Sequence, residues 1–199
     1  MKSIVVISHA LVVNDLRQRW HHLADRGWTV HLIIPRYWVS TRFDEKVIYR
    51  NKTGKSGNLY VHTLPTTNNS VWRTYFLIGL LPLLVKLKPD FVYTIHEEDC
   101  LIHFQIALIS MILRKTKYMF FTMKSREIFL NRLYRRMLWN IVKKYTFAAF
   151  VHCPDAVDAL KRANFKKLIT IQTQIGINEL KFKKYNQIDK DLSRKKYMI

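Results

Sequence analysis

Residues 90–97 read Asp-Phe-Val-Tyr-Thr-Ile-His-Glu, an apolar run that ends in polar, titratable groups. Aromatic and β-branched residues favour extended backbone, so positions 90–95 predict a strand. Similar short runs precede and follow it. They lie at 4–7, 28–34, 59–64, 117–122, 147–152 and 168–171. The chain therefore predicts about seven strands at fairly regular intervals.

Helical patterns of about a dozen residues separate most of these runs. They cover 14–26, 71–87, 100–113, 127–145 and 155–163. Strands that alternate with helices imply right-handed crossovers and a parallel sheet. We predict the α/β class, a doubly wound, mainly parallel, Rossmann-like sheet with helices on both faces. The polar stretch 36–58 is predicted as a loop. One domain is expected over 1–183, and a basic linker over 184–199.

The chain is strongly basic for its size. Its 199 residues carry a net charge of +20, with a pI near 10.1, and most of the excess lies after residue 100. Such an imbalance favours an anionic partner: nucleic acid, an acidic membrane surface or a phosphorylated ligand. The longest apolar stretch, near 75–85, is too short to span a membrane and contains Pro82. The two cysteines predict neither a disulfide framework nor a zinc site.

Doubly wound sheets bind ligands at the carboxyl ends of their strands. His96 and Glu97 follow the strand at 90–95, where they could recognise a hydroxylated ligand or move a proton. The alternative is a packing or helix-capping role. Ser8 and His9 follow the first strand, in a loop without the glycines of a dinucleotide site. We therefore expect no nicotinamide or flavin cofactor.

Two further segments carry cations. Lys124, Ser125 and Arg126 follow the strand at 117–122, where they could clamp a phosphate, although Ser125 could equally cap a helix. The segment Gly54-Lys55-Ser56 resembles the end of a phosphate loop but lacks its first glycine, so an exposed basic loop is expected.

The predicted helix at 127–145 has an apolar stripe, expected to face the core, and a basic remainder. The stripe comprises Leu130, Leu133, Met137, Ile141 and Tyr145. Between residues 114 and 144 there are ten basic residues and one acid. Each cation near an anionic bilayer contributes about 1 kcal/mol, so several together would hold a domain there. The predicted membrane surface comprises Arg132, Arg135, Arg136, Lys143 and Lys144.

Near its end the chain resembles the amino-terminal half of a GT-B glycosyltransferase of the family 4 type. Gly176, Ile177, Asn178 and Phe182 match the fixed positions of the turn that closes that domain, G-[IV]-[DN]-x-x-x-F. The run 90–97 is similar to the family's fourth strand, which ends in a histidine matched by His96. A strand that ends in threonine, a basic helix and a proline-started helix follow in the family's order, over about residues 1–185.

The resemblance implies a role. In that family the first domain binds the sugar acceptor, and a second domain binds the nucleotide-sugar donor; sugar transfer retains the anomeric configuration without a metal. The chain would then be the acceptor-binding half of a hexosyltransferase, incomplete and inactive alone, in cell-envelope polysaccharide or glycolipid synthesis. The acceptor would be a sugar or lipid-linked molecule. The expected location is cytoplasmic, peripheral at the inner face of the cell membrane. His96 would be the catalytic candidate, with Ser8, His9, Glu97, Lys124, Ser125 and Arg126 on the acceptor.

Two alternatives stay open from the sequence. The net charge also fits a nucleic-acid-binding module, although no helix-turn-helix, zinc finger or stacking-aromatic motif supports one. A non-catalytic partner subunit of a split glycosyltransferase fits the same residues. Neither the donor sugar, the acceptor nor the linkage follows from the sequence.

Overall fold

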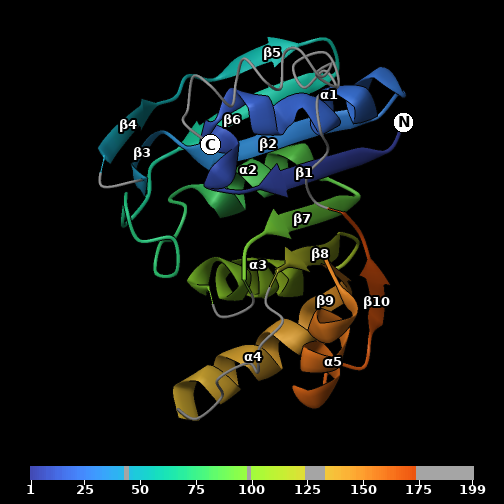
Figure 1. Cartoon of the computed structure of the whole chain (residues 1–199). Helices are drawn as coiled ribbons and strands as arrows, with labels where there is room; N and C mark the ends of the chain where they lie inside the picture. The colour runs from blue at the N-terminus through green and yellow to red at the C-terminus, as the bar shows by residue number, and fades with distance from the viewer. Residues whose placement is uncertain (43–44, 98–99, 124–132, 174–199) are drawn as a thin grey trace, which may run out of the picture.

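A single parallel sheet organises the chain in a computed structural model that describes residues 1–42, 45–97, 100–123 and 133–173 (Figure 1). All seven predicted strands belong to it, and the α/β class is confirmed. An eighth strand pairs antiparallel at one edge, in the order β10-β9-β8-β7-β1-β2-β6-β5. The strands are β1 (Ser3–Ile7), β2 (Thr29–Pro35), β5 (Gly54–Ser56), β6 (Leu59–Leu64), β7 (Phe91–Ile95), β8 (Lys117–Thr122), β9 (Thr146–Val151) and β10 (Leu168–Ile171).

Helices cover both faces of this sheet, as predicted. On one face, Trp20 and Ala24 of α1 (Gln18–Asp25) pack with Val6 and Leu32 of the strands. The opposite face carries four helices, whose apolar residues share the other core cluster. These are α2 (Leu80–Leu87), α3 (Leu101–Ile112), α4 (Leu133–Tyr145) and α5 (Pro154–Arg162). The short 3₁₀ segments Ala10–Val12 and Asn14–Arg17 lead into α1.

The strand order reverses at β1, which pairs with β2 on one side and β7 on the other. The amino ends of β1 and β7 are tied together: the backbone N–H and the hydroxyl of Ser3 donate to the Asp90 carboxylate at 2.7 and 2.9 Å. At the other end, neighbouring strands send their chains away in opposite directions. Such a switch point leaves a crevice where ligands bind in open α/β sheets.

The prediction of a loop over 36–58 is wrong. β3 (Tyr37–Arg42) and β4 (Glu45–Arg50) form an antiparallel hairpin, and β5 follows. Trp38 of this hairpin is buried in the core. The many polar residues on the outward face of this hairpin obscured the alternation of polar and apolar residues that indicates a strand. The segment Gly54-Lys55-Ser56 is thus an exposed edge strand, not a phosphate loop.

The predicted helix over 71–87 is also shorter than expected. Gly79 adopts a positive φ of 85°, which an L side chain rarely takes, and the helix begins only at Leu80. Residues 71–79 form an irregular segment, in which Leu77 makes an isolated antiparallel bridge with Thr66. This segment lies beside the site described below.

Among the other helices, the 14–26 pattern divides into a 3₁₀ segment and α1. The apolar stripe expected on the basic helix is partly misplaced. Leu133 and Met137 are exposed, by 75% and 59%, whereas Trp139 and Val142 enter the core. In the described part of the chain, no helix combines the length and apolarity needed to traverse a bilayer.

Candidate functional site

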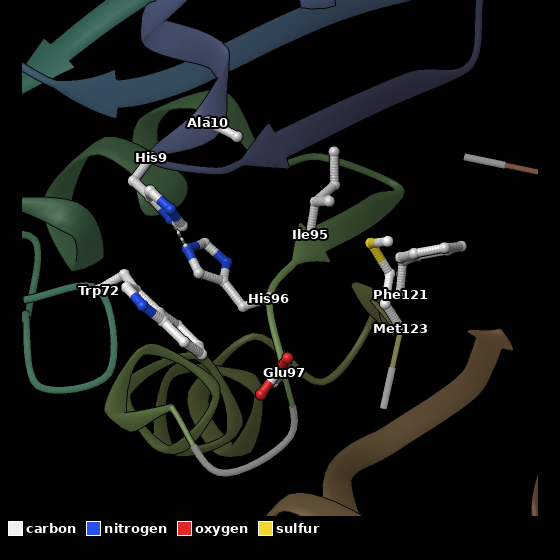
Figure 2. Close-up of a pocket in the computed structure, with 8 residues that line it drawn as sticks. All are labelled: His9, Ala10, Trp72, Ile95, His96, Glu97, Phe121 and Met123. Atoms are coloured by element: carbon white, nitrogen blue, oxygen red, sulfur yellow. Dashed lines mark hydrogen bonds between the residues drawn. The ribbon is translucent and has the colours of Figure 1, made fainter. Parts of the chain in front are cut away.

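A pocket opens at the carboxyl ends of β1, β7 and β8, at the switch point of the sheet (Figure 2). Its volume is about 230 Å³. Pockets for drug-sized ligands usually exceed ~300 Å³, so this space suits one sugar-sized ring rather than a whole nucleotide sugar. The lining residues are His9, Ala10, Trp72, Ile95, His96, Glu97, Phe121 and Met123.

Three polar side chains, two of them buried and one half-buried, meet at the pocket wall. The Tyr75 hydroxyl lies 2.7 Å from Nε2 of His96, and Nδ1 of His9 lies 3.1 Å from the same nitrogen. The chain reaches these positions from the loop after β1, the irregular segment 71–79 and the end of β7. The cluster thus links the three parts of the chain around the switch point.

The hydrogen-bond network favours one tautomer of His96. The backbone N–H of His9 acts on the Tyr75 hydroxyl oxygen and partly offsets the rise in the pKa of Tyr75, an arrangement that leaves the hydroxyl proton for His96. Within the described residues, the acceptor that this hydroxyl reaches is Nε2 of His96. Nε2 therefore carries a lone pair, and the ring proton of neutral His96 sits on Nδ1.

Nδ1 of His96 has no hydrogen-bond partner in the described chain, although it is shielded from bulk water. Figure 2 shows this side of the ring turned away from His9. A buried donor without a partner is uncommon and destabilising. A ligand oxygen or an ordered water at this pocket wall would satisfy it.

Burial keeps this cluster neutral. Desolvation lowers the pKa of His96 well below 6.5, and the nearby His9 and His103 lower it further. Desolvation also lowers the pKa of His9 to about 4, and it raises the pKa of Tyr75 well above 10. At neutral pH His96 is an uncharged hydrogen-bond donor, which suits orientation of a ligand better than proton abstraction through Nδ1.

A second histidine, His103, is buried and holds the backbone of His96 in place. Nε2 of His103 on α3 donates to the backbone carbonyl of His96, at 3.2 Å. Its Nδ1 is thereby an acceptor for the hydroxyl of Tyr118, and Thr94 lies 3.2 Å away. These groups join α3, β7 and β8 and fix the backbone that carries His96.

The outer wall of the pocket is aromatic and acidic. The Trp72 ring is stacked with His9, with centroids 6.3 Å apart and an interplanar angle of 16°. The Arg73 guanidinium lies over the Trp72 ring, 4.6 Å from its centroid, and 3.7 Å from the Glu97 carboxylate. The wall therefore offers an apolar ring face and a carboxylate that accepts hydrogen bonds.

The structure brings some of the predicted site residues together. His9, His96 and Glu97 line the pocket. Ser8 is fully buried: its hydroxyl donates to the Ile95 carbonyl and accepts from the Ala10 N–H. The predicted residues Lys124, Ser125 and Arg126 lie outside the described part of the chain.

Sequence reasoning missed Trp72 and Tyr75, because both fell inside a stretch predicted as helix. The available signal was Gly79, which separates this aromatic segment from α2.

The predicted membrane surface is described only in part, since Arg132 lies outside the described residues. Arg136 and Lys144 of α4 are exposed, and Arg135 and Lys143 are half-buried. Desolvation, followed by the charge of Lys166, lowers the pKa of Lys143. The described residues contain no cluster of three or more side chains suited to a metal.

Solved structures share this fold. A short chain of sucrose-phosphate synthase from Thermosynechococcus elongatus matches with a TM-score of 0.53 and 16% identity, covering 89% of this chain and 91% of that one. A longer chain of the same protein matches with a TM-score of 0.60 and 14% identity, covering 100% of this chain and 53% of that one.

Arabidopsis thaliana UGT89C1, complexed with UDP-L-rhamnose, matches with a TM-score of 0.51 and 12% identity, over 94% of this chain and 55% of that one. The chain thus spans about half the length of the two longer structures. No protein-family model and no curated protein matches the sequence. At these identities the likeness concerns the fold alone: the chain has a Rossmann-like α/β fold that it shares with these structures.

Proposed function

We propose that the chain is the acceptor-binding half of a nucleotide-sugar-dependent glycosyltransferase. The observation that carries the proposal is the position of the pocket, at the switch point of a fold shared with GT-B enzymes. A second domain, of about the same size, would bind the donor and is expected to supply the residues that contact it.

The pocket chemistry supports a sugar ring as the ligand. The Trp72 face offers an apolar platform, the Glu97 carboxylate accepts hydrogen bonds from hydroxyl groups, and Nδ1 of His96 donates one. In this proposal His96 orients the acceptor hydroxyl toward the donor. The fixed, neutral imidazole lowers the entropic cost of reaction by holding the nucleophile in place.

We further propose a setting in cell-envelope polysaccharide or glycolipid synthesis, at the inner face of the cell membrane. The net charge of +20 and the exposed cations of α4 support an anionic surface as a partner. A lipid-linked acceptor would bring its sugar to the pocket while its lipid stays in the bilayer. Family 4 resemblance, rather than the fold, supports retention of configuration and the absence of a metal.

The test is ligand binding by saturation-transfer NMR with free hexoses, a hexose-phosphate and UDP-sugars. We expect signals from an acceptor-type sugar and none from a UDP-sugar, since the donor site lies in the second domain. Trp72→Ala should weaken sugar binding about tenfold, equivalent to ~1.4 kcal/mol. Trp28→Ala, which removes a tryptophan beside Phe91, is the matched control. Turnover of a UDP-sugar by this chain alone, or tighter binding to duplex DNA than to any sugar, would contradict the proposal.

A further inference from the structure

The outer faces of α2 and α3 carry apolar side chains where a surface helix normally carries charges. α3 has no charged residue in twelve positions, yet Leu108, Met111 and Ile112 are 40–63% exposed. Leu81 and Val85 are exposed on α2, and Ile78 just before it is 55% exposed. We call these six residues the α2–α3 apolar face: Ile78, Leu81, Val85, Leu108, Met111 and Ile112.

The two halves of this face are linked just before α2 begins. The Gln105 side chain of α3 accepts from the Leu77 N–H at 3.0 Å and donates to the Leu77 carbonyl at 2.8 Å. This double hydrogen bond fixes the chain before α2 against the middle of α3. Both helices lead into neighbouring parallel strands, β7 and β8, so they run in the same direction. Residues at spacings of three and four, such as 81 and 85 or 108, 111 and 112, share one side of a helix.

Within the two segments that form the face, the charged side chains have one sign. Residues 71–89 and 100–122 contain no Asp or Glu. They contain six Lys and Arg residues, all exposed: Arg73, Lys86, Lys88, Arg114, Lys115 and Lys117. Of the four carboxylates between the two segments, Asp90 is engaged by Ser3 and Glu97 by Arg73, and those at positions 98 and 99 lie outside the described residues. An exposed apolar surface on segments whose charged residues are all cations is typical of groups that bind at a lipid interface.

We infer that the α2–α3 apolar face inserts into the interface of an anionic lipid bilayer. The chemistry of the face identifies an anionic bilayer as its partner. Anionic headgroups complement the nearby cations, and acyl chains complement the apolar side chains. The inference rests on the membrane part of the proposed function and names the surface that makes the contact. It also places the pocket near the bilayer, because Trp72 of the pocket and Ile78 of the apolar face belong to one short segment. An acceptor sugar linked to a lipid could then enter the pocket without leaving the bilayer.

The first experiment compares sedimentation with vesicles of phosphatidylcholine and phosphatidylglycerol at low and high salt. We expect Val85→Gln/Met111→Gln/Ile112→Gln to weaken binding at least tenfold at both salt concentrations. The control, Ile48→Gln/Leu168→Gln/Ile171→Gln, removes three equally exposed apolar side chains from β4 and β10 and should bind like the parent. Loss of α4 cations, in Arg136→Gln/Lys144→Gln, should weaken binding mainly at low salt.

The second experiment measures how deeply the apolar face inserts into the bilayer. An environment-sensitive fluorophore is attached at Val85→Cys, in a Cys153→Ser background that removes the partly exposed natural cysteine. We expect a blue shift with vesicles at this position and none from the same probe at Ile48→Cys. An unshifted probe at position 85 would overturn the inference, as would an apolar-face variant that binds like the parent. If the α4 variant alone loses binding, the membrane proposal stands and this contact surface fails. If the parent is a dimer in sedimentation velocity and the apolar-face variant a monomer, the face binds a second copy instead.

Discussion

The two ring nitrogens of His96 have different surroundings: Nε2 faces Tyr75, and Nδ1 has no partner in the described chain. Two amide substitutions separate their roles. His96→Gln places an amide near the Nε2 position, so it should keep most of the stability and lose acceptor binding. His96→Asn places an amide near Nδ1, so it should keep part of the binding. It should also lose ~1–3 kcal/mol of unfolding free energy, because the buried Tyr75 hydroxyl loses its acceptor.

Urea denaturation and NMR titration of the acceptor measure the two effects independently. Equal losses of stability and of binding in both variants would mean that His96 only packs, and that its unpartnered nitrogen has no ligand.

Single residues also mark how much of the site follows from the sequence. His9, His96 and Glu97 were predictable, because a parallel strand delivers the residue after its last apolar position to the carboxyl edge. Trp72 and Tyr75 were not, since an irregular segment has no periodicity from which to place its side chains. The fully buried position of Ser8 likewise depends on backbone groups of β7, which no local pattern reveals.

At the scale of one element, α2 has faces of opposite character. Leu84 is fully buried, whereas its neighbour Val85 is 45% exposed. Leu84→Ala should lower the unfolding free energy by about 2–5 kcal/mol, because it leaves a cavity in the core. Val85→Ala should change it by less than ~0.5 kcal/mol. Chemical denaturation compares the two directly, and similar losses would mean that Val85 is covered in solution.

Elements with strong periodicity were predicted well, and irregular ones were not. β8 and β10 match their predicted bounds, and α3 and α5 begin and end within one residue of theirs. The β3–β4 hairpin was missed, because only one of its faces meets the core and the composition of 36–58 is polar overall. The break before α2 depends on a single backbone angle at Gly79, where the surrounding apolar residues suggested an uninterrupted helix.

For the whole molecule, buried histidines predict loss of stability in acid. Desolvation lowers the pKa of His9 and of His31 to about 4, and it also lowers the pKa of His62 and His96. The unfolded chain binds these protons near pH 6.5 and the folded chain does not, so stability is complete above pH 6.5 and falls as the pH drops toward 4. For His9, with its pKa moved from 6.5 to about 4, the loss approaches ~3 kcal/mol at pH 4, since one pH unit corresponds to about 1.36 kcal/mol.

Urea denaturation between pH 7 and pH 4.5 measures this slope. His9→Gln removes one of the titrating groups and should flatten it. A profile that is level over this interval would contradict the neutral, buried state of the histidine cluster.

The place of β1 in the middle of the sheet has a consequence for synthesis on the ribosome. The first part of the sheet, β1, β2, β6 and β5, has been synthesised by residue 64, while the second side of β1 still lacks a neighbour. β7 then pairs with that free side, and β8, β9 and β10 each join the strand made just before. At ~5–20 residues per second, about 1.5–6 seconds pass between the end of β6 and the end of β7, and during that time one edge of β1 is open. No strand pair that has already formed therefore has to separate to admit a later strand. The free edge of β1 is covered once residues 91–95 are available to pair with it.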